Sequence, residues 1–214
     1  MELQYYGANC VRIAGKKAAV TIDDNLSEVG LKSVTKVGDI VLFSGPHKDS
    51  PKDPKLVIDQ PGEYEVSDVS IQGIAARSHI DEAGKLNATM FKLIVEDVRI
   101  AVVGHVYPEL NDKQLEALGT IDILIIPVGG NGYTLDPVGA LKIIKKIEPK
   151  LVIPTHYADK AVKYEVPQQE LEVAIKELAM EPKETIDKLK LKASDFISDV
   201  TQLVILQMQW SIEL

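Results

Sequence analysis

The sequence of 214 residues is 45% hydrophobic and 26% charged, with a formal net charge of −8. These values are typical of a globular protein with one substantial core, so we predict a single domain over residues 1–214. The negative charge argues against non-specific nucleic-acid binding, which needs a basic surface. There is no signal-peptide pattern or membrane span, and the one cysteine, Cys10, fits a reducing compartment; we expect a cytoplasmic protein without membrane or nucleic-acid partners.

Short strands separated by turns are predicted for the first half of the chain. The β-prone stretches are residues 3–6, 10–13, 18–22, 39–43, 69–76, 90–95 and 98–103. We interpret residues 59–63, which contain Pro61 and Gly62, as a turn. The stretch 98–103 is almost continuously apolar, as expected of a strand covered on both faces.

The second half alternates between helix and strand. Asn111 is the predicted N-cap of a short helix that ends at Gly119, and Asp136-Pro137 opens a second helix. A third helix is predicted over residues 167–179, and strands over 121–126, 151–154 and 201–208. Strands followed by alternating strands and helices predict a layered α/β protein in which helices cover sheets.

The four histidines occupy similar places in the chain. His47, His79, His105 and His156 each directly follow an apolar, strand-like run. Strands that end on the same side of a sheet bring their last residues to one edge, where open α/β sheets place their sites. Imidazole is the commonest metal ligand in proteins, so the four side chains, with Asp49 beside His47, form a candidate metal site. Any single histidine at a strand end is more often a surface or turn residue.

Several stretches together resemble a known family. They are "YYGANCVRI", "VTIDDN", "QPGEYEV", "VSIQGI", "IDILIIPVGG" and "IEPKLVIPTHY". With them the chain resembles the metallo-β-lactamase fold superfamily, in particular bacterial metal-dependent hydrolases related to ascorbate-6-phosphate lactonase. The resemblance implies a four-layer αββα sandwich, in which two facing β-sheets carry outer helices and the metals lie at one rim.

The resemblance also implies a metal loop that has lost part of its ligands. The family pattern S-H-x-H-x-D-H aligns with "SGPHKDS", which keeps His47 and Asp49 in ligand positions. Gly45 stands in place of the first histidine and Ser50 in place of the last. The loop by itself therefore supplies fewer donors than the family pattern requires.

The remaining ligand positions fall on the other three histidines. His79 aligns with the next metal histidine and His156, in "PTHY", with the final one. His105 replaces the carboxylate that bridges two metals in the family. A neutral imidazole offers one electron pair to one metal, so a two-metal centre is not expected.

Two main functions follow from this pattern. The first is a divergent metal-dependent hydrolase that holds one zinc or manganese ion, uses it to activate water, and acts on an ester, lactone or phosphoester of unknown identity. Asp49 would be its general base or a ligand. The alternative is a metal-free, non-catalytic relative that binds a ligand or partner in the former active-site cleft. A bound ion with a purely structural role is a third interpretation.

Other residues beside the expected rim have two interpretations each. The loop 129–132 either approaches a ligand through its backbone or simply connects a strand to a helix. Tyr133 and Tyr157 could line a pocket, and Asp23 either supports the site or has a structural role.

Overall fold

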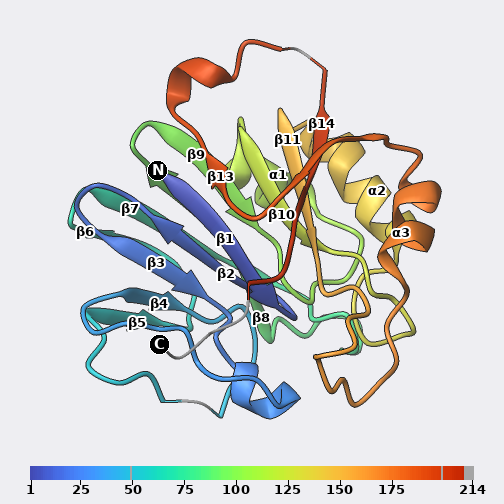
Figure 1. Cartoon of the computed structure of the whole chain (residues 1–214), viewed down its shortest axis with the longest axis horizontal. Coiled ribbons are helices and arrows are strands. Elements are labelled where there is room, and N and C mark those ends of the chain that lie inside the picture. Colours follow the sequence, from blue (N-terminus) through green and yellow to red (C-terminus); the bar gives the residue numbers. More distant parts are fainter. Residues whose placement is uncertain (49, 199, 210–214) are drawn as a thin grey trace.

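Two β-sheets packed face to face form the centre of the molecule (Figure 1). The computed structural model describes residues 1–48, 50–198 and 200–209. Within these residues the six-stranded sheet has the order β13 (Leu189–Lys190), β1 (Glu2–Gly7), β2 (Cys10–Ala14), β3 (Ala19–Ile22), β4 (Ile40–Leu42), β5 (Leu56–Ile58). The eight-stranded sheet has the order β12 (Pro182–Ile186), β14 (Gln202–Leu206), β11 (Leu151–Thr155), β10 (Ile123–Pro127), β9 (Val98–Val102), β8 (Ala88–Val95), β7 (Val69–Ala76), β6 (Gly62–Val66).

The core lies between the sheets because apolar residues alternate along the strands. Successive strand residues point to opposite faces, so Val11 and Ile13 of β2 are buried while Arg12 points outward. The same apolar cluster contains Phe91 of β8 and Ile100 of β9 from the opposite sheet. Burial of this shared face is the main force that holds the two sheets together.

The helices begin and end where the sequence predicts, with one exception. Asn111 caps α1 (Asp112–Leu118) through a capping box with Gln114. Asp136 accepts the Gly139 N–H at 2.6 Å and caps α2 (Pro137–Ile147). The predicted helix 167–179 is shorter, because α3 (Leu171–Leu178) begins later. Two short 3₁₀ helices, η1 (Leu26–Val29) and η2 (Ala193–Asp195), complete the helical elements of the described residues.

The α-helices of the described residues lie on the eight-stranded sheet. There α1 contacts β7, α2 contacts β10, and α3 contacts α2. None of these helices is long and apolar enough to cross a membrane. The two facing sheets confirm the predicted fold class, although α-helices cover only one of the two outer faces in the part of the chain that the structure describes.

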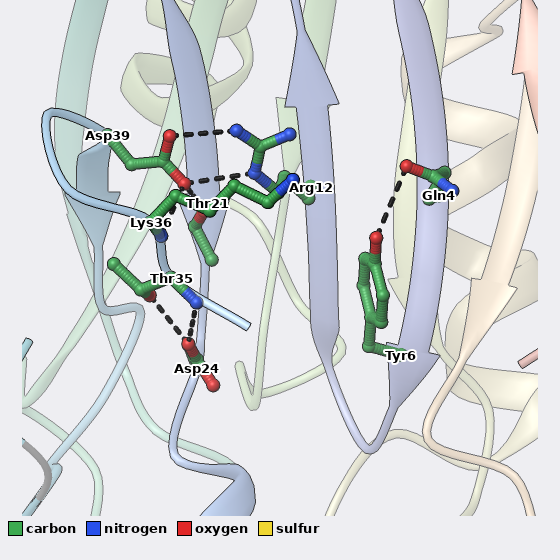
Figure 2. A network of polar contacts seen from close by, with 8 residues as sticks. All are labelled: Gln4, Tyr6, Arg12, Thr21, Asp24, Thr35, Lys36 and Asp39. Carbon is green, nitrogen blue, oxygen red and sulfur yellow. Dashed lines mark hydrogen bonds and ion pairs between the residues drawn. The ribbon is translucent and has the colours of Figure 1, made fainter. Parts of the chain in front are cut away.

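The outer face of the six-stranded sheet carries a network of polar contacts (Figure 2). Asp39 accepts two hydrogen bonds from the Arg12 guanidinium, at 2.9 and 2.8 Å, and one from the Thr21 hydroxyl at 2.8 Å. Asp24 accepts the backbone and hydroxyl hydrogens of Thr35 at 2.7 and 2.5 Å. These carboxylates tie the segment between η1 and β4 to the sheet.

Four strands were not expected from the sequence. β6 begins at Gly62, within the predicted turn at residues 59–63, and β5, β12 and the two-residue β13 fall in stretches without a predicted strand. All four of these strands lie at an edge of a sheet. Edge strands in proteins are often short and polar, so their hydrophobic pattern is weak.

Candidate functional site

Three of the four histidines meet at one edge of the eight-stranded sheet. β9 and β11 both run parallel to β10, and β7 has the direction of β9 because each is antiparallel to β8. Their carboxyl ends therefore share an edge, and His79, His105 and His156 follow these ends. The backbone N–H of His79 donates to the carbonyl of His105 at 2.7 Å. The convergence inferred from the sequence holds for these three residues.

His105 and His156 form a close pair of imidazoles. Their ring centroids lie 4.6 Å apart and their planes are nearly perpendicular, at 84°. Tyr133 lies 5.1 Å from the His105 ring, and Tyr164 lies 4.8 Å from the His156 ring. Tyr157, by contrast, packs against the buried Tyr5, and its hydroxyl donates to Leu206. Of the two tyrosines singled out from the sequence, Tyr133 thus belongs to the histidine pair and Tyr157 to the core.

The pair lies in the wall of a cavity of about 630 Å³. This volume is within the usual range of small-molecule sites in proteins. Residues from both sheets line the cavity, among them Asn9, Asp23, Ser44, His105, Tyr133 and His156. The cavity is therefore built where the two sheets meet, at the predicted rim.

Burial keeps both imidazoles of the pair neutral. Burial lowers the pKa of His156 to about 4, although its hydrogen bond to Gln168 opposes the shift. The pKa of His105 is well below its ordinary value because of burial and then because of the neighbouring His156 and His79. At neutral pH each ring consequently has one nitrogen with a free electron pair.

The backbone of His156 has an unusual conformation. Its φ angle is 57°, in the left-handed region that side chains with a Cβ rarely adopt. The His156 N–H donates to Ala8, and Nδ1 lies 3.1 Å from Gln168 Oε1. These contacts place the ring at the cavity at some cost in backbone strain, which is a common feature of functional sites.

His47 lies in different surroundings from the pair. Its ring stacks on Phe43 with a centroid distance of 3.6 Å and an angle of 7°, and its Nε2 lies 3.7 Å from the Asp59 carboxylate. Among the described residues, its neighbours Pro46 and Lys48 line the cavity, whereas His47 does not. Asp49, predicted as a ligand and as the catalytic residue, lies outside the described residues.

Asp23 connects the six-stranded sheet to the loop after β4. The backbone N–H and the hydroxyl of Ser44 both donate to its carboxylate at 2.6 Å. Gly104, just before His105, makes room for this contact, because a Cβ at its position would lie 2.2 Å from Ser44 Oγ. Burial raises the pKa of Asp23 to about 6, against the opposing effect of the Ser44 hydrogen bonds. Of its two interpretations, the geometry favours support of the site.

The arrangement of these donors does not fit a complete metal site. Among the described residues, no group of three or more His, Cys, Asp or Glu side chains is placed to hold an ion. His105 and His156 have suitable donor chemistry, and the buried Nδ1 atoms of His79 and His105 have no hydrogen-bond partner within the described part of the chain. Two adjacent imidazoles are nevertheless fewer ligands than a protein zinc site normally has.

The fold and the histidine-lined rim define the class of protein. Two facing β-sheets with a cavity at one edge, and histidines that follow the strand ends, are the arrangement of the metallo-β-lactamase fold. Residues 2–156 match the family model described as the β-lactamase superfamily domain. The chain therefore belongs to the β-lactamase superfamily.

Individual relatives agree with this assignment. A protein of Thermococcus onnurineus named as a metal-dependent hydrolase is 32% identical over 101 residues, which are 45% of this chain and 44% of the relative. A protein of Carboxydothermus hydrogenoformans with the same designation is 44% identical over 45 residues, which are 21% of this chain and 20% of the relative. The matches thus span less than half of these curated relatives.

A solved structure covers nearly the whole fold. It is a Thermotoga maritima protein proposed to be a zinc-dependent hydrolase of the metallo-β-lactamase superfamily. Its TM-score with this chain is 0.73, with 23% identity, and the match covers 97% of this chain and 99% of the other. At this identity the likeness demonstrates the shared fold.

Sequence reasoning missed the residues that support the pair. Gln168 lies inside the predicted helix 167–179, but it precedes α3 and contacts His156. Asn9 lies in the turn between β1 and β2, and its Oδ1 accepts the hydroxyl hydrogen of Thr155 at 2.9 Å. Gln168 lies in no quoted motif, and Asn9 lies in the stretch "YYGANCVRI" without an assigned role, because both contacts join different segments of the chain.

Proposed function

We propose that this chain is a divergent hydrolase of the metallo-β-lactamase superfamily that acts on a small ester, lactone or phosphoester in the rim cavity. The observation that carries the proposal is the close pair His105–His156, with ring centroids 4.6 Å apart, in the wall of a cavity of about 630 Å³. A lone cysteine that is buried supports a reducing compartment such as the cytoplasm.

The names of the relatives support metal dependence, and the histidines limit how many ions are expected. The family's bridging carboxylate is replaced by His105 in the alignment, and an imidazole nitrogen serves one metal. We therefore propose at most one zinc or manganese ion per chain. Its ligands would come from His47, Asp49, His79, His105 and His156, and binding would require these side chains to approach one another more closely than they do here.

The chain's own residues supply part of the chemistry of hydrolysis. A neutral imidazole in the cavity wall accepts a hydrogen bond from water and can orient that water toward a bound substrate. Tyr133 and Tyr164 pack around the two rings and restrict their movement. Asp23, held by Ser44, fixes the start of the loop that leads to His47.

A second candidate function is metal-free binding of a ligand in the same cavity. The observation that favours it is the position of His47, which stacks on Phe43 and faces Asp59. With His47 held in this way, no set of three donors forms among the described side chains. A protein of this kind would keep the cavity but have no hydrolytic activity.

Elemental analysis after equilibration with Zn(II) or Mn(II) and desalting separates the two candidates. About one retained ion per chain, lost in His156→Ala, supports the hydrolase and justifies assays with esters, lactones and phosphoesters. No retained ion and no turnover of these substrates would contradict it and favour metal-free binding. His47→Ala serves as the comparison, because stoichiometric metal in that variant removes His47 from the ligand set.

A further inference from the structure

We propose that Gln168 is a positioning residue that holds the His156 imidazole in the tautomer with its proton on Nδ1, so that Nε2 carries the free electron pair in the cavity wall. The proposal deepens the proposed function and rests on it for the role of His156. It assigns a task to a buried residue of the loop before α3 that neither the family pattern nor the sequence motifs single out.

The orientation of the Gln168 amide follows from its two hydrogen bonds. Nε2 donates to the Val166 carbonyl at 2.6 Å. A carbonyl oxygen only accepts, so the end of the amide that faces Val166 must be the NH₂ group. Oε1 then faces His156 Nδ1 at 3.1 Å. Because an amide oxygen has no hydrogen to donate, the shared hydrogen must belong to Nδ1.

The surrounding backbone leaves Gln168 little freedom. A Cβ on Gly129 would lie 2.1 Å from Gln168 Oε1 and 2.1 Å from the His156 carbonyl oxygen, so the close approach of the three residues requires glycine. The next residue is also fixed, since the Gln169 N–H donates to Gly129 and the Gln169 carbonyl accepts from Ala158. Of the two interpretations of the 129–132 loop, the contacts at Gly129 favour a connecting role, because glycine there lets the loop pack closely against Gln168 and His156.

Burial strengthens the effect of this hydrogen bond. Only 8% of Gln168 and 3% of His156 is exposed to solvent. Water therefore does not compete for Nδ1, and a buried imidazole N–H without its acceptor would destabilise this arrangement. The alternative tautomer would place two acceptors, Nδ1 and Oε1, against each other.

The fixed tautomer limits which chemical groups His156 can bind. With Nδ1–H directed at Gln168, Nε2 offers an electron pair and no hydrogen. It suits a metal cation or the O–H of a water or alcohol. A phosphate or carboxylate oxygen, which needs a donor, finds none at this nitrogen. We therefore expect the acyl or phosphoryl oxygens of a substrate to be recognised by other groups in the cavity.

Long-range ¹H–¹⁵N correlation spectra of the metal-free full chain, labelled at the histidine nitrogens, test the proposal directly. The His156 signals are identified by their absence in His156→Gln. We expect Nδ1 to have the shift of a protonated nitrogen and Nε2 that of an unprotonated one. The reverse pattern, or a fast mixture of both tautomers, would overturn the proposal.

Three variants distinguish positioning from general structural support. Gln168→Leu should release the tautomer preference, and Gln168→Glu, which keeps an acceptor at the same place, should retain Nδ1–H. Gln169→Leu is the neighbouring control and should leave the His156 signals as in wild type. An unchanged tautomer in a folded Gln168→Leu, checked by its amide spectrum, would show that another group positions His156.

Titration with Zn(II) alone and with inorganic phosphate separates this proposal from the proposed function. Zn(II) should move the Nε2 signal of His156, with affinity reduced about 10–100-fold in Gln168→Leu, whereas phosphate should leave it in place. If the tautomer is as expected and Zn(II) does not bind, the role of Gln168 stands and metal dependence fails. If Zn(II) binds His156 through Nδ1, the role of Gln168 is refuted and metal dependence stands.

Discussion

Asp23 and Ser44 are joined by two hydrogen bonds of 2.6 Å, one from the backbone N–H and one from the hydroxyl of the serine. The carboxylate is buried, and burial raises its pKa to about 6 although both bonds favour the charged form. The contact therefore fixes the loop after β4 while it places a titratable group next to the cavity.

The raised pKa of Asp23 predicts a specific pH dependence of stability. The folded protein binds this proton more tightly than the unfolded chain, whose carboxyl has a pKa near 3.9. The contribution of Asp23 to the free energy of unfolding is fully present below about pH 4. It decreases as the pH rises and is lost once the pH passes about 6. We expect the free energy of unfolding to drop by about 3 kcal/mol relative to Asp23→Asn across that window.

Urea denaturation at a series of pH values measures this difference. The exposed control Asp187→Asn should follow the wild-type profile. Parallel profiles for wild type and Asp23→Asn would contradict the prediction.

Replacing Gly104 by alanine should lower stability in two ways, through a steric clash and through the backbone conformation, and the two effects can be separated. Its φ is +58°, and an added Cβ would meet Ser44 Oγ at 2.2 Å. Gly38 has a φ of +82°, and no described residue lies within 4 Å of an added Cβ, so it is the matched control. We expect Gly38→Ala to cost about 1–2 kcal/mol from conformation alone. Gly104→Ala should cost roughly 1–3 kcal/mol more, and equal losses by thermal denaturation would disprove the close contact.

Breaking the Arg12–Asp39 pair should destabilise the protein far more than breaking an exposed pair. Burial raises the pKa of Asp39, but hydrogen bonds from Arg12, Lys36 and Thr21 outweigh it and lower the pKa overall. Asp39→Ala leaves the part-buried guanidinium unpaired, and we expect a loss of about 3–5 kcal/mol. Lys17→Ala, which removes the exposed partner of Asp68, should cost less than about 1 kcal/mol. Similar losses in chemical denaturation would refute this ranking.

Restoring the family's ligand pattern should increase the number of metal ions that each chain retains. The triple variant Gly45→His, Ser50→His, His105→Asp supplies the missing histidines and the bridging carboxylate. At the first position a Cβ has room, since no described residue lies within 4 Å of one added at Gly45. We expect more retained Zn(II) per chain than in wild type by elemental analysis. An unchanged metal content in the folded variant would mean that the loop is aligned wrongly.

Local sequence signals predicted much of the fold. Asn111 and Asp136 specify helix starts through side-chain caps, which depend only on nearby residues. β12 was missed because it is an edge strand with an exposed, charged centre, so neither of its faces shows a hydrophobic pattern. The start of α3 was misplaced because the backbone of Gln169 is bound to Gly129 and Ala158, which lie in other loops.

The site was predictable to the extent that the sheet topology determines it. Three histidines follow strands that run in the same direction, and their meeting needs only that direction and the apolar runs before them. The surroundings of His47 depend instead on Phe43 and Asp59, and those of His156 on Gln168. Such contacts between loops leave no periodic trace in the sequence. The set of ligands that the resemblance implies remains a prediction.

The left-handed backbone at His156 sets two opposing effects against each other when this residue is replaced. A glycine at this position would relieve about 1 kcal/mol of backbone strain. It would also remove a side chain that is only 3% exposed and leave Gln168 Oε1 without its partner, at a cost of about 1–3 kcal/mol. The buried contacts of the ring therefore offset the strain of its own backbone.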